Sequence, residues 1–250
     1  MIIDMNAWAG YWSAYPVQGE VSQVRSSLRE IGVERMLLSP MHAVWCHNPH
    51  LCNDLVYQAA EEYPDIDPVP VLDPTIPTWL EELGRALHAP RARWIKLIPA
   101  YSRYTLEGAD GLLSALARAG MGVIIQTRLE DPRRQHPLAQ VADTPVKAVV
   151  SAARRHPNLE FIIGGGSWAA IQEARTEIAK LPNLFAETSQ LDGVDSLKSL
   201  IEWGLAPKIL FGTHSPFFVP LAGLARVLND LEDGTAYDIL GGNAQKLLKK

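Results

Sequence analysis

Five polar side chains stand within or just after short apolar runs of the sequence: Asn6, Lys96, Gln126, Arg128 and His214. A lysine inside an apolar strand must find a partner or a ligand, because an unpaired buried charge is unfavourable. Histidine titrates near neutral pH, and a planar guanidinium group suits the capture of carboxylate or phosphate. These residue types predict acid–base chemistry by His214, with Lys96 and Arg128 as electrostatic stabilisers of a bound anion.

Each of these residues also has a purely structural explanation. Lys96 would lie in the protein interior, paired with a carboxylate such as Asp4 or Glu187. His214 would be a capping or loop histidine. Arg128 begins a charged stretch interrupted by prolines, and such stretches are more often solvated loops than binding sites. The sequence leaves both explanations open.

A second group of chemically active side chains lies in one short stretch: His42, Cys46, His47, His50 and Cys52. Imidazole and thiolate groups are zinc ligands, but the spacing matches no zinc knuckle and no partner pair recurs elsewhere. We therefore interpret the stretch as a lid over a pocket, and a metal-binding loop is the less favoured alternative. Aromatic residues that could line the mouth of this pocket are Trp8, Tyr11, Trp12, Tyr15 and Trp45.

The elements that must position these residues alternate along the whole chain, with short β-branched runs followed by longer helical patterns. Eight such units, with strands apolar on both faces, predict an α/β fold of the (β/α)8 TIM-barrel type, in one domain over residues 1–250. An open, doubly wound sheet is the alternative. The first predicted strand and the turn after it cover 2–10, and the other predicted strands are 33–38, 66–72, 94–98, 123–126, 159–163, 184–187 and 209–211. Predicted helices are 21–31, 53–63, 77–87, 105–119, 145–155, 167–179 and 196–203, with two more from about 217 and 235.

Composition restricts the class of protein. The chain has 250 residues and a net charge of −5, so a basic surface for nucleic acid is not expected. No apolar run approaches the roughly 20 residues of a membrane span, and the start lacks the basic residues of a signal peptide. Its 2 cysteines do not make a disulfide framework. We expect a reduced, cytoplasmic protein with a small-molecule partner, and a homo-oligomer remains open.

Five stretches carry a resemblance to a known family: IIDMNAWAG at 2–10, GMGVIIQT at 120–127, PNLEFIIGGG at 157–166, KILFGTHSPF at 208–217 and ILGGNAQKL at 239–247. Together they resemble strand ends and the terminal helix of the amidohydrolase-related branch of the metal-dependent amidohydrolases. That branch includes decarboxylases of aromatic acids. The resemblance spans the chain and implies the same barrel, with its functional face at the C-terminal ends of the strands.

The resemblance also implies five metal-ligand positions, and this chain departs from the family at all of them. Histidines of the first, fifth and sixth strands and the aspartate after the eighth are replaced by Asn6, Trp8, Gln126, Gly164 and His214. A catalytic zinc needs at least three His or carboxylate ligands plus an open position, and only His214 could bind one. We expect that the metal site has been lost and that there is no cofactor; zinc is the less favoured alternative.

The combined interpretation is an amidohydrolase-like barrel of hydrolase or decarboxylase lineage. It would bind a small anionic or aromatic molecule at the C-terminal face, in a cavity on which Lys96, Arg128 and His214 converge. Two alternatives are a catalytically silent binding or scaffold protein and a metal-dependent hydrolase with an unorthodox site. The predicted catalytic residues are His214 and Lys96, and the predicted substrate-binding residues are Asn6, Trp8, Gln126 and Arg128.

Overall fold

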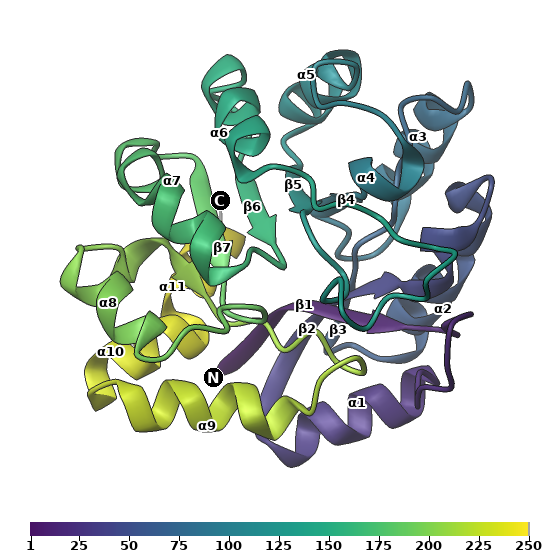
Figure 1. The fold of residues 1–250 in the computed structure, drawn as a ribbon. Helices are drawn as coiled ribbons and strands as arrows, with labels where there is room; N and C mark the ends of the chain where they lie inside the picture. The colour runs from purple at the N-terminus through teal and green to yellow at the C-terminus, as the bar shows by residue number, and fades with distance from the viewer. Residues whose placement is uncertain (250) are drawn as a thin grey trace.

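Strands alternate with helices along the chain, and Figure 1 shows them in a computed structural model that describes residues 1–249. Within this range, eight strands form two parallel sheets. The first sheet contains β1 (Ile2–Ala9), β2 (Val33–Pro40) and β3 (Ile66–Pro68). The second contains, in this order, β4 (Trp94–Leu97), β5 (Gly122–Gln126), β6 (Phe161–Gly164), β7 (Leu184–Glu187) and β8 (Ile209–Leu210).

Backbone hydrogen bonds join the two sheets at both of their edges. Beyond β3, Lys96 N–H donates to Pro70 O at 2.9 Å, and Leu72 N–H donates to Lys96 O at 3.1 Å. At the other edge, Met5 N–H of β1 donates to Phe211 O at 2.9 Å. The strands therefore follow one another around a ring, and their C-terminal ends share one face, as the predicted barrel requires.

Helices lie outside the strands in Figure 1. None of the helices within residues 1–249 combines the length and the hydropathy needed to cross a membrane. Their bounds are α1 (Val21–Glu30), α2 (Asp54–Glu62), α3 (Trp79–His88), α4 (Pro99–Ser102), α5 (Asp110–Ala119), α6 (Val146–Arg155), α7 (Trp168–Lys180), α8 (Ser196–Glu202), α9 (Pro220–Asp230), α10 (Asp233–Tyr237) and α11 (Asn243–Leu248). Short 3-10 helices are η1 (Met41–Trp45), η2 (Pro49–Cys52) and η3 (Ala206–Lys208), and η4 (Asp238–Gly242) is a π-helix.

Apolar residues on the strands separate into an outer and an inner layer. On β5, Val123 and Ile125 belong to the large cluster that includes the buried faces of the helices. Ile124, between them, belongs to a smaller cluster to which other strands also contribute. This alternation fills the inside of the ring with side chains, so the barrel is a packed core and not a pore. Strand residues of the inner cluster include Ile3, Met5, Leu37, Trp94, Ile124, Ile162, Phe185 and Leu210.

Three predicted boundaries differ from the structure by three residues or more, for local reasons. The third strand ends at Pro68 and does not reach residue 72, because Pro68 and Pro70 have no N–H to continue a ladder. The helix predicted from Thr105 begins at Asp110. Thr105 Oγ1 instead accepts a hydrogen bond from Gly108 N at 3.3 Å within a turn. The helix predicted from residue 217 begins at Pro220, since the preceding segment packs against the ring of His214.

Candidate functional site

Lys96 lies at the centre of the barrel's C-terminal face and is completely buried. Its ammonium donates a hydrogen bond to Asn6 Oδ1 at 2.6 Å and lies 3.8 Å from the centroid of the Trp8 ring. Asn6 in turn donates from Nδ2 to Glu187 Oε1 at 2.9 Å. A cation over the face of an indole is attracted by the ring quadrupole, more strongly when water is excluded. Lys96, Asn6 and Glu187 thus form one hydrogen-bonded chain, covered by Trp8.

Glu187 anchors the far end of this chain. Its carboxylate also accepts hydrogen bonds from Gly165 N at 2.6 Å, Ser189 N at 2.6 Å and Ser189 Oγ at 2.8 Å. A Cβ atom on Gly212 would lie 2.3 Å from Glu187 Oε2, so only glycine leaves room for the carboxylate at this point. Among the described residues Lys96 forms no ion pair with a carboxylate: it is linked to Glu187 only through the Asn6 amide.

Asp4 is the second buried carboxyl near the lysine. Asn6 N and Thr213 N donate to Asp4 Oδ1 at 2.9 and 3.1 Å, and Thr213 Oγ1 donates to Oδ2 at 2.5 Å. Burial raises the pKa of Asp4 to about 6, against the opposing effect of these hydrogen bonds. Burial also lowers the pKa of Lys96 to about 7, although Glu187 and Asp4 both favour its charged form. The charge of the centre therefore changes close to neutral pH.

His214 is buried beside this network. Its Nε2 lies 2.8 Å from Leu129 O, and because a carbonyl only accepts, Nε2 must carry the proton. Its Nδ1 is then a buried acceptor with no hydrogen-bond partner among the described residues. Burial, with Lys96 and Arg128 nearby, lowers the pKa of His214 to about 3. The ring is consequently neutral at physiological pH and adds no positive charge to the site.

Gln126 and Arg128 extend the cluster toward the surface. Gln126 Nε2 donates to Arg128 O at 2.8 Å, and Gln126 Oε1 is buried without a hydrogen-bond partner in the described part of the chain. The Arg128 side chain is 11% exposed; its Nε donates to Gln190 Oε1 at 2.6 Å, and its ion pair with Asp192 spans 3.5 Å. Arg128 is therefore held by protein groups and does not present a free fork to a ligand in this conformation.

An open cavity of about 940 Å³ lies beside this centre, and none of the six residues predicted from the sequence lines it. Its walls are the segments that follow β2, β3, β4 and β5 on the C-terminal face of the barrel. Lys96, Arg128 and His214 are brought close enough to interact electrostatically, but not onto the wall of this cavity. Convergence of the three on one open cavity was expected and is not seen, because Trp8 and neighbouring rings fill the space above Lys96.

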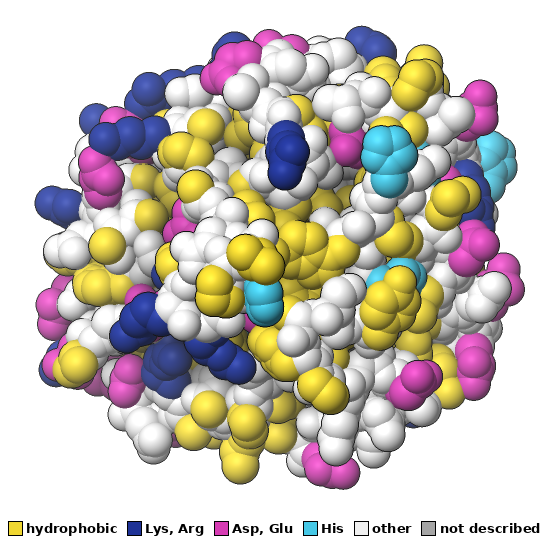
Figure 2. All heavy atoms as spheres, turned by 45° about the vertical axis from the view of Figure 1, so that its right-hand side comes forward, with side chains coloured by type: hydrophobic (Ala, Val, Ile, Leu, Met, Phe, Trp, Pro, Cys, Tyr) yellow, Lys and Arg dark blue, Asp and Glu magenta, His cyan; other side chains and the backbone are white. Residues whose placement is uncertain are grey.

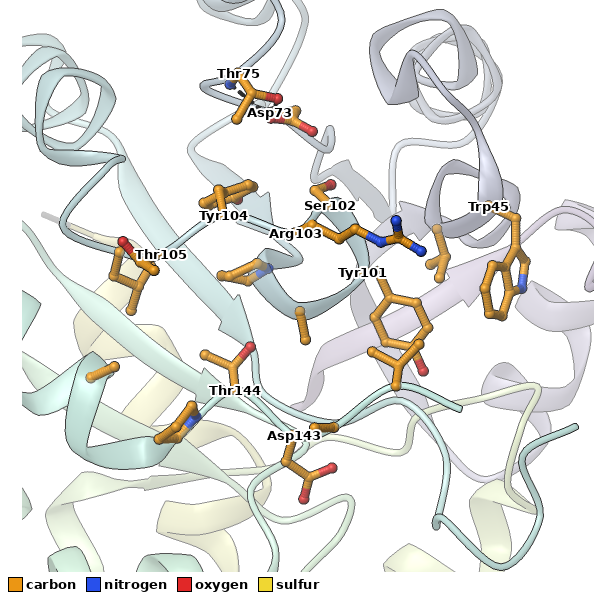
Figure 3. A pocket seen from close by; sticks show the side chains of 18 of the residues that line it. Trp45, Asp73, Thr75, Tyr101, Ser102, Arg103, Tyr104, Thr105, Asp143 and Thr144 are labelled. Atoms are coloured by element: carbon orange, nitrogen blue, oxygen red, sulfur yellow. Dashed lines mark hydrogen bonds between the residues drawn. The ribbon is translucent and has the colours of Figure 1, made fainter. Parts of the chain in front are cut away.

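The cavity combines aromatic walls with polar groups that have few partners (Figure 3). The Trp45 ring packs against Tyr101, with 5.4 Å between centroids and an interplanar angle of 82°. In Figure 3 the side chain of Arg103 extends toward Trp45, near the ring of Tyr101. Arg103 has a left-handed φ of 59°, and its exposed guanidinium forms no ion pair with the described residues. Thr144 Oγ1 is buried and also lacks a partner within residues 1–249.

Arg103, Tyr101 and Thr144 were not singled out by sequence reasoning. The first two belong to Tyr101-Ser102-Arg103-Tyr104-Thr105, an aromatic and polar stretch directly after the fourth strand. Its position beyond a strand end was a usable signal, since loops there form the functional face of a barrel. Of the predicted aromatic mouth, Trp45 does line the cavity, whereas Trp8 is buried. Figure 2 shows hydrophobic side chains gathered around the middle of one face of the molecule.

The histidine and cysteine stretch after β2 uses its side chains for local contacts. His50 Nε2 accepts from Asp73 N at 3.0 Å, and the His42 ring stacks on Tyr11 with 5.0 Å between centroids. Cys46 and His47 line the cavity. Among residues 1–249, no three or more His, Cys, Asp or Glu side chains are grouped so as to hold a metal ion.

The five positions that the resemblance assigns to metal ligands lie together at this centre. Gln126 and Gly164 are partners in neighbouring strands, and the rings of Trp8 and His214 are 6.0 Å apart. The donors there are two amides, one neutral imidazole and no thiolate, and the Lys96 ammonium already lies against Asn6. This donor set does not fit a catalytic zinc, which takes imidazole, thiolate and carboxylate ligands.

Comparison with known proteins agrees with the architecture. A structure of an uncharacterised TIM-barrel protein from Bordetella bronchiseptica is 17% identical, with a TM-score of 0.77, over 99% of this chain and 98% of the other. A 2,6-dihydroxybenzoate decarboxylase from Rhizobium is 16% identical, with a TM-score of 0.74 over 99% and 98%. A probable 2-pyrone-4,6-dicarboxylic acid hydrolase from Acinetobacter baumannii is 12% identical, with a TM-score of 0.67 over 100% and 99%. No curated protein matches the chain.

These likenesses establish the TIM-barrel fold, and the sequence itself gives the family. The amidohydrolase family, in its Amidohydro_2 form, matches residues 4–250, which is nearly the whole chain. The (β/α)8 barrel expected from the alternation of strands and helices is thus confirmed, and this chain belongs to the amidohydrolase family.

Proposed function

We propose that this amidohydrolase-family barrel has lost the family's catalytic metal and binds a small anionic or aromatic molecule on its C-terminal face. The observation that carries the proposal is the Lys96 ammonium, 2.6 Å from Asn6 Oδ1 at the centre that the resemblance assigns to the family's metal ligands. Lys96 then serves as the resident cation of the site, held between Asn6 and the ring of Trp8.

Electrostatics support the exclusion of a metal. Two unit charges 4 Å apart interact by about 4 kcal/mol at an effective dielectric constant of 20, and a divalent ion doubles this repulsion. A metal ion at Asn6 would meet that repulsion from the Lys96 ammonium. The carboxylate of Glu187 is meanwhile occupied by four hydrogen bonds from Asn6, Gly165 and Ser189. The Glu187 carboxylate is therefore fully engaged by the protein's own groups.

The ligand is proposed to occupy the cavity between the segments after β2 and β5. Arg103 supplies a guanidinium without an ion-pair partner in the described residues, which suits a carboxylate or phosphate. Trp45 and Tyr101 supply aromatic faces for stacking, and Thr144, on the cavity wall, has a buried hydroxyl with no hydrogen-bond partner among the described residues. A small molecule with an aromatic ring or an acid group matches these features. The similar 2,6-dihydroxybenzoate decarboxylase is consistent with this class of ligand.

Two versions of the proposal differ in chemistry. In the first, the chain is a metal-free hydrolase or decarboxylase whose ligand reaches from the cavity past Trp8 to the buried centre, where His214 Nδ1 accepts a proton and Lys96 stabilises negative charge. In the second, the chain binds its ligand without turning it over. His214 distinguishes them: a His214→Gln variant should lose turnover in the first case, whereas in the second neither protein has any.

The experiment is a thermal-shift screen of small aromatic and aliphatic acids, followed by calorimetry, with elemental analysis of the same protein. Protein purified without added metal should carry far less than one equivalent of zinc, iron or manganese. Bound acids should bind less tightly to Arg103→Gln, and Arg128→Gln serves as the matched variant outside the cavity. A stoichiometric metal that resists mild chelation would disprove the metal-free part. Equal loss of binding in both variants, or in Arg128→Gln alone, would place the ligand elsewhere.

A further inference from the structure

The 2 cysteines of the chain lie in the short segment between β2 and α2. Cys46 directly follows η1, and Cys52 ends η2. Their sulfur atoms are 2.9 Å apart, within the contact distance of two sulfur atoms, and both cysteines are free. This proximity is not needed for the proposed ligand site, in which neither thiol has been given a role.

We propose that Cys46 and Cys52 are a reversible oxidation site, forming an intrachain disulfide with hydrogen peroxide as the oxidant. The Cys46 thiolate attacks one peroxide oxygen, the O–O bond breaks, and Cys46 becomes a sulfenic acid while the released hydroxide takes up a proton. Cys52 sulfur then attacks Cys46 sulfur, its thiol proton passes to the departing hydroxide, and water leaves. In total, two thiols give up two electrons and two protons, and one peroxide becomes two waters.

The surroundings of the two thiols divide these roles. Cys46 is half-buried and lines the open cavity, so a small oxidant reaches it through that opening. Cys52 is only 6% exposed and does not line the cavity. Burial and the neighbouring Cys46 also raise the pKa of the Cys52 thiol to about 12. Cys46 is thus the sulfur that meets the oxidant, and Cys52 is the one that resolves the sulfenic acid.

A disulfide at this place would stiffen one wall of the cavity. The link would close the segment that contains His47, and Cys46 is directly bonded to Trp45, whose ring packs on Tyr101 and Trp12. The sulfur atoms need to approach by less than 1 Å to reach a disulfide bond of about 2.05 Å, so the wall closes with little movement. Oxidation would therefore fix the aromatic wall near its present position.

The test uses purified full-length protein treated with hydrogen peroxide and then catalase. Because the chain has 2 cysteines, the thiol count under denaturing conditions should fall from 2 to none. The intact mass should fall by two hydrogen atoms, the mass should remain that of a monomer, and dithiothreitol should reverse both changes. Retained thiols, or a gain of oxygen atoms in place of the loss of hydrogen atoms, would overturn the proposal.

Two single substitutions serve as matched controls. Cys52→Ser should leave Cys46 without a resolving partner, so this variant should gain oxygen atoms. Cys46→Ser should keep its remaining, buried thiol unmodified over the same time, and equal oxidation of both variants would refute the division of roles. Thermal melts confirm that each variant is folded. Hydrogen exchange of a peptide covering residues 41–52 should be slower in the oxidised protein, and unchanged exchange would refute the stiffening of the wall.

Discussion

The charged side chains of the barrel centre and of the neighbouring cavity differ in their burial and in their partners. At the centre, Lys96, Asp4 and Glu187 are fully buried, and each has hydrogen-bond partners from the protein. In the cavity, Arg103 is exposed and forms no ion pair within the described residues. Buried charges must be compensated by the protein, whereas a cation on a cavity wall is free to be compensated by a ligand. We propose from this contrast that the centre stabilises the fold and that the cavity is the place of recognition.

The strongest test of this contrast is Lys96→Met. Removing the ammonium leaves two carboxyl groups buried without their cation, and breaking a buried charge network costs about 3–5 kcal/mol. The free energy of unfolding from urea titration should fall by this amount. The control is Lys246→Met, because the Lys246 side chain is 73% exposed and its amine lies 3.6 Å from Asp238 Oδ1. It should change stability by less than about 0.5 kcal/mol. Equal effects of the two substitutions would show that the centre has no special structural role.

A smaller effect is expected from Gly212→Ala. The new Cβ would lie 2.3 Å from Glu187 Oε2, so the carboxylate must move away from its donors. Overpacking of this kind costs about 1–3 kcal/mol. Gly84→Ala is the matched change, because a Cβ there meets nothing within 4 Å and lies inside α3. It should raise stability by about 0.5–1 kcal/mol. A neutral Gly212→Ala would mean that the Glu187 carboxylate is not tightly held.

The substitution Arg103→Lys tests the proposed role of the cavity in ligand binding. The change keeps the charge and removes the bidentate fork, so an acid found in the ligand screen should bind more weakly by about 1–2 kcal/mol. Stability should barely change, since Arg103 forms no ion pair in the described part of the chain. Calorimetry measures the first effect and urea titration the second. A large loss of stability with unchanged binding would assign Arg103 to the fold, like Lys96.

Lys96 and Asp4 together should impose a pH dependence of stability. The pKa of Asp4 is raised to about 6 in the folded protein, so its contribution to stability falls as pH rises from 3.8 to about 6. The pKa of Lys96 is lowered to about 7, so the unfolded chain binds one more proton above that value, and stability rises from about pH 7 toward 10.5.

These two slopes predict a minimum of stability between about pH 6 and 7. Subtracting the profile of Lys96→Met from that of the wild type should isolate the rise above pH 7. The measurement is chemical denaturation at a series of pH values. Parallel profiles of the two proteins would show that Lys96 keeps an ordinary pKa in the folded state.

Sequence reasoning located the centre because its residues lie at strand ends, where the position of a side chain follows from the alternation of the strand. Lys96 was predicted from a charge inside an apolar run, and one of its two explanations named Asp4 and Glu187. The cavity could not be predicted in the same way. Its wall depends on four loops, on the short helix α4 and on the left-handed conformation of Arg103. Loop conformations of this kind depend on tertiary contacts that no local pattern encodes.

Where the barrel wall passes from β3 to β4, both backbone hydrogen bonds described above are made by Lys96 itself, to Pro70 and from Leu72. The main chain of this one residue therefore joins the segment after β3 to β4 at this seam, and its side chain places a positive charge near the buried carboxyl groups of Asp4 and Glu187. A transient parting of this seam would expose the amine to water at the same moment. The rate at which an acylating reagent labels Lys96 would then measure how often the barrel opens locally at this seam.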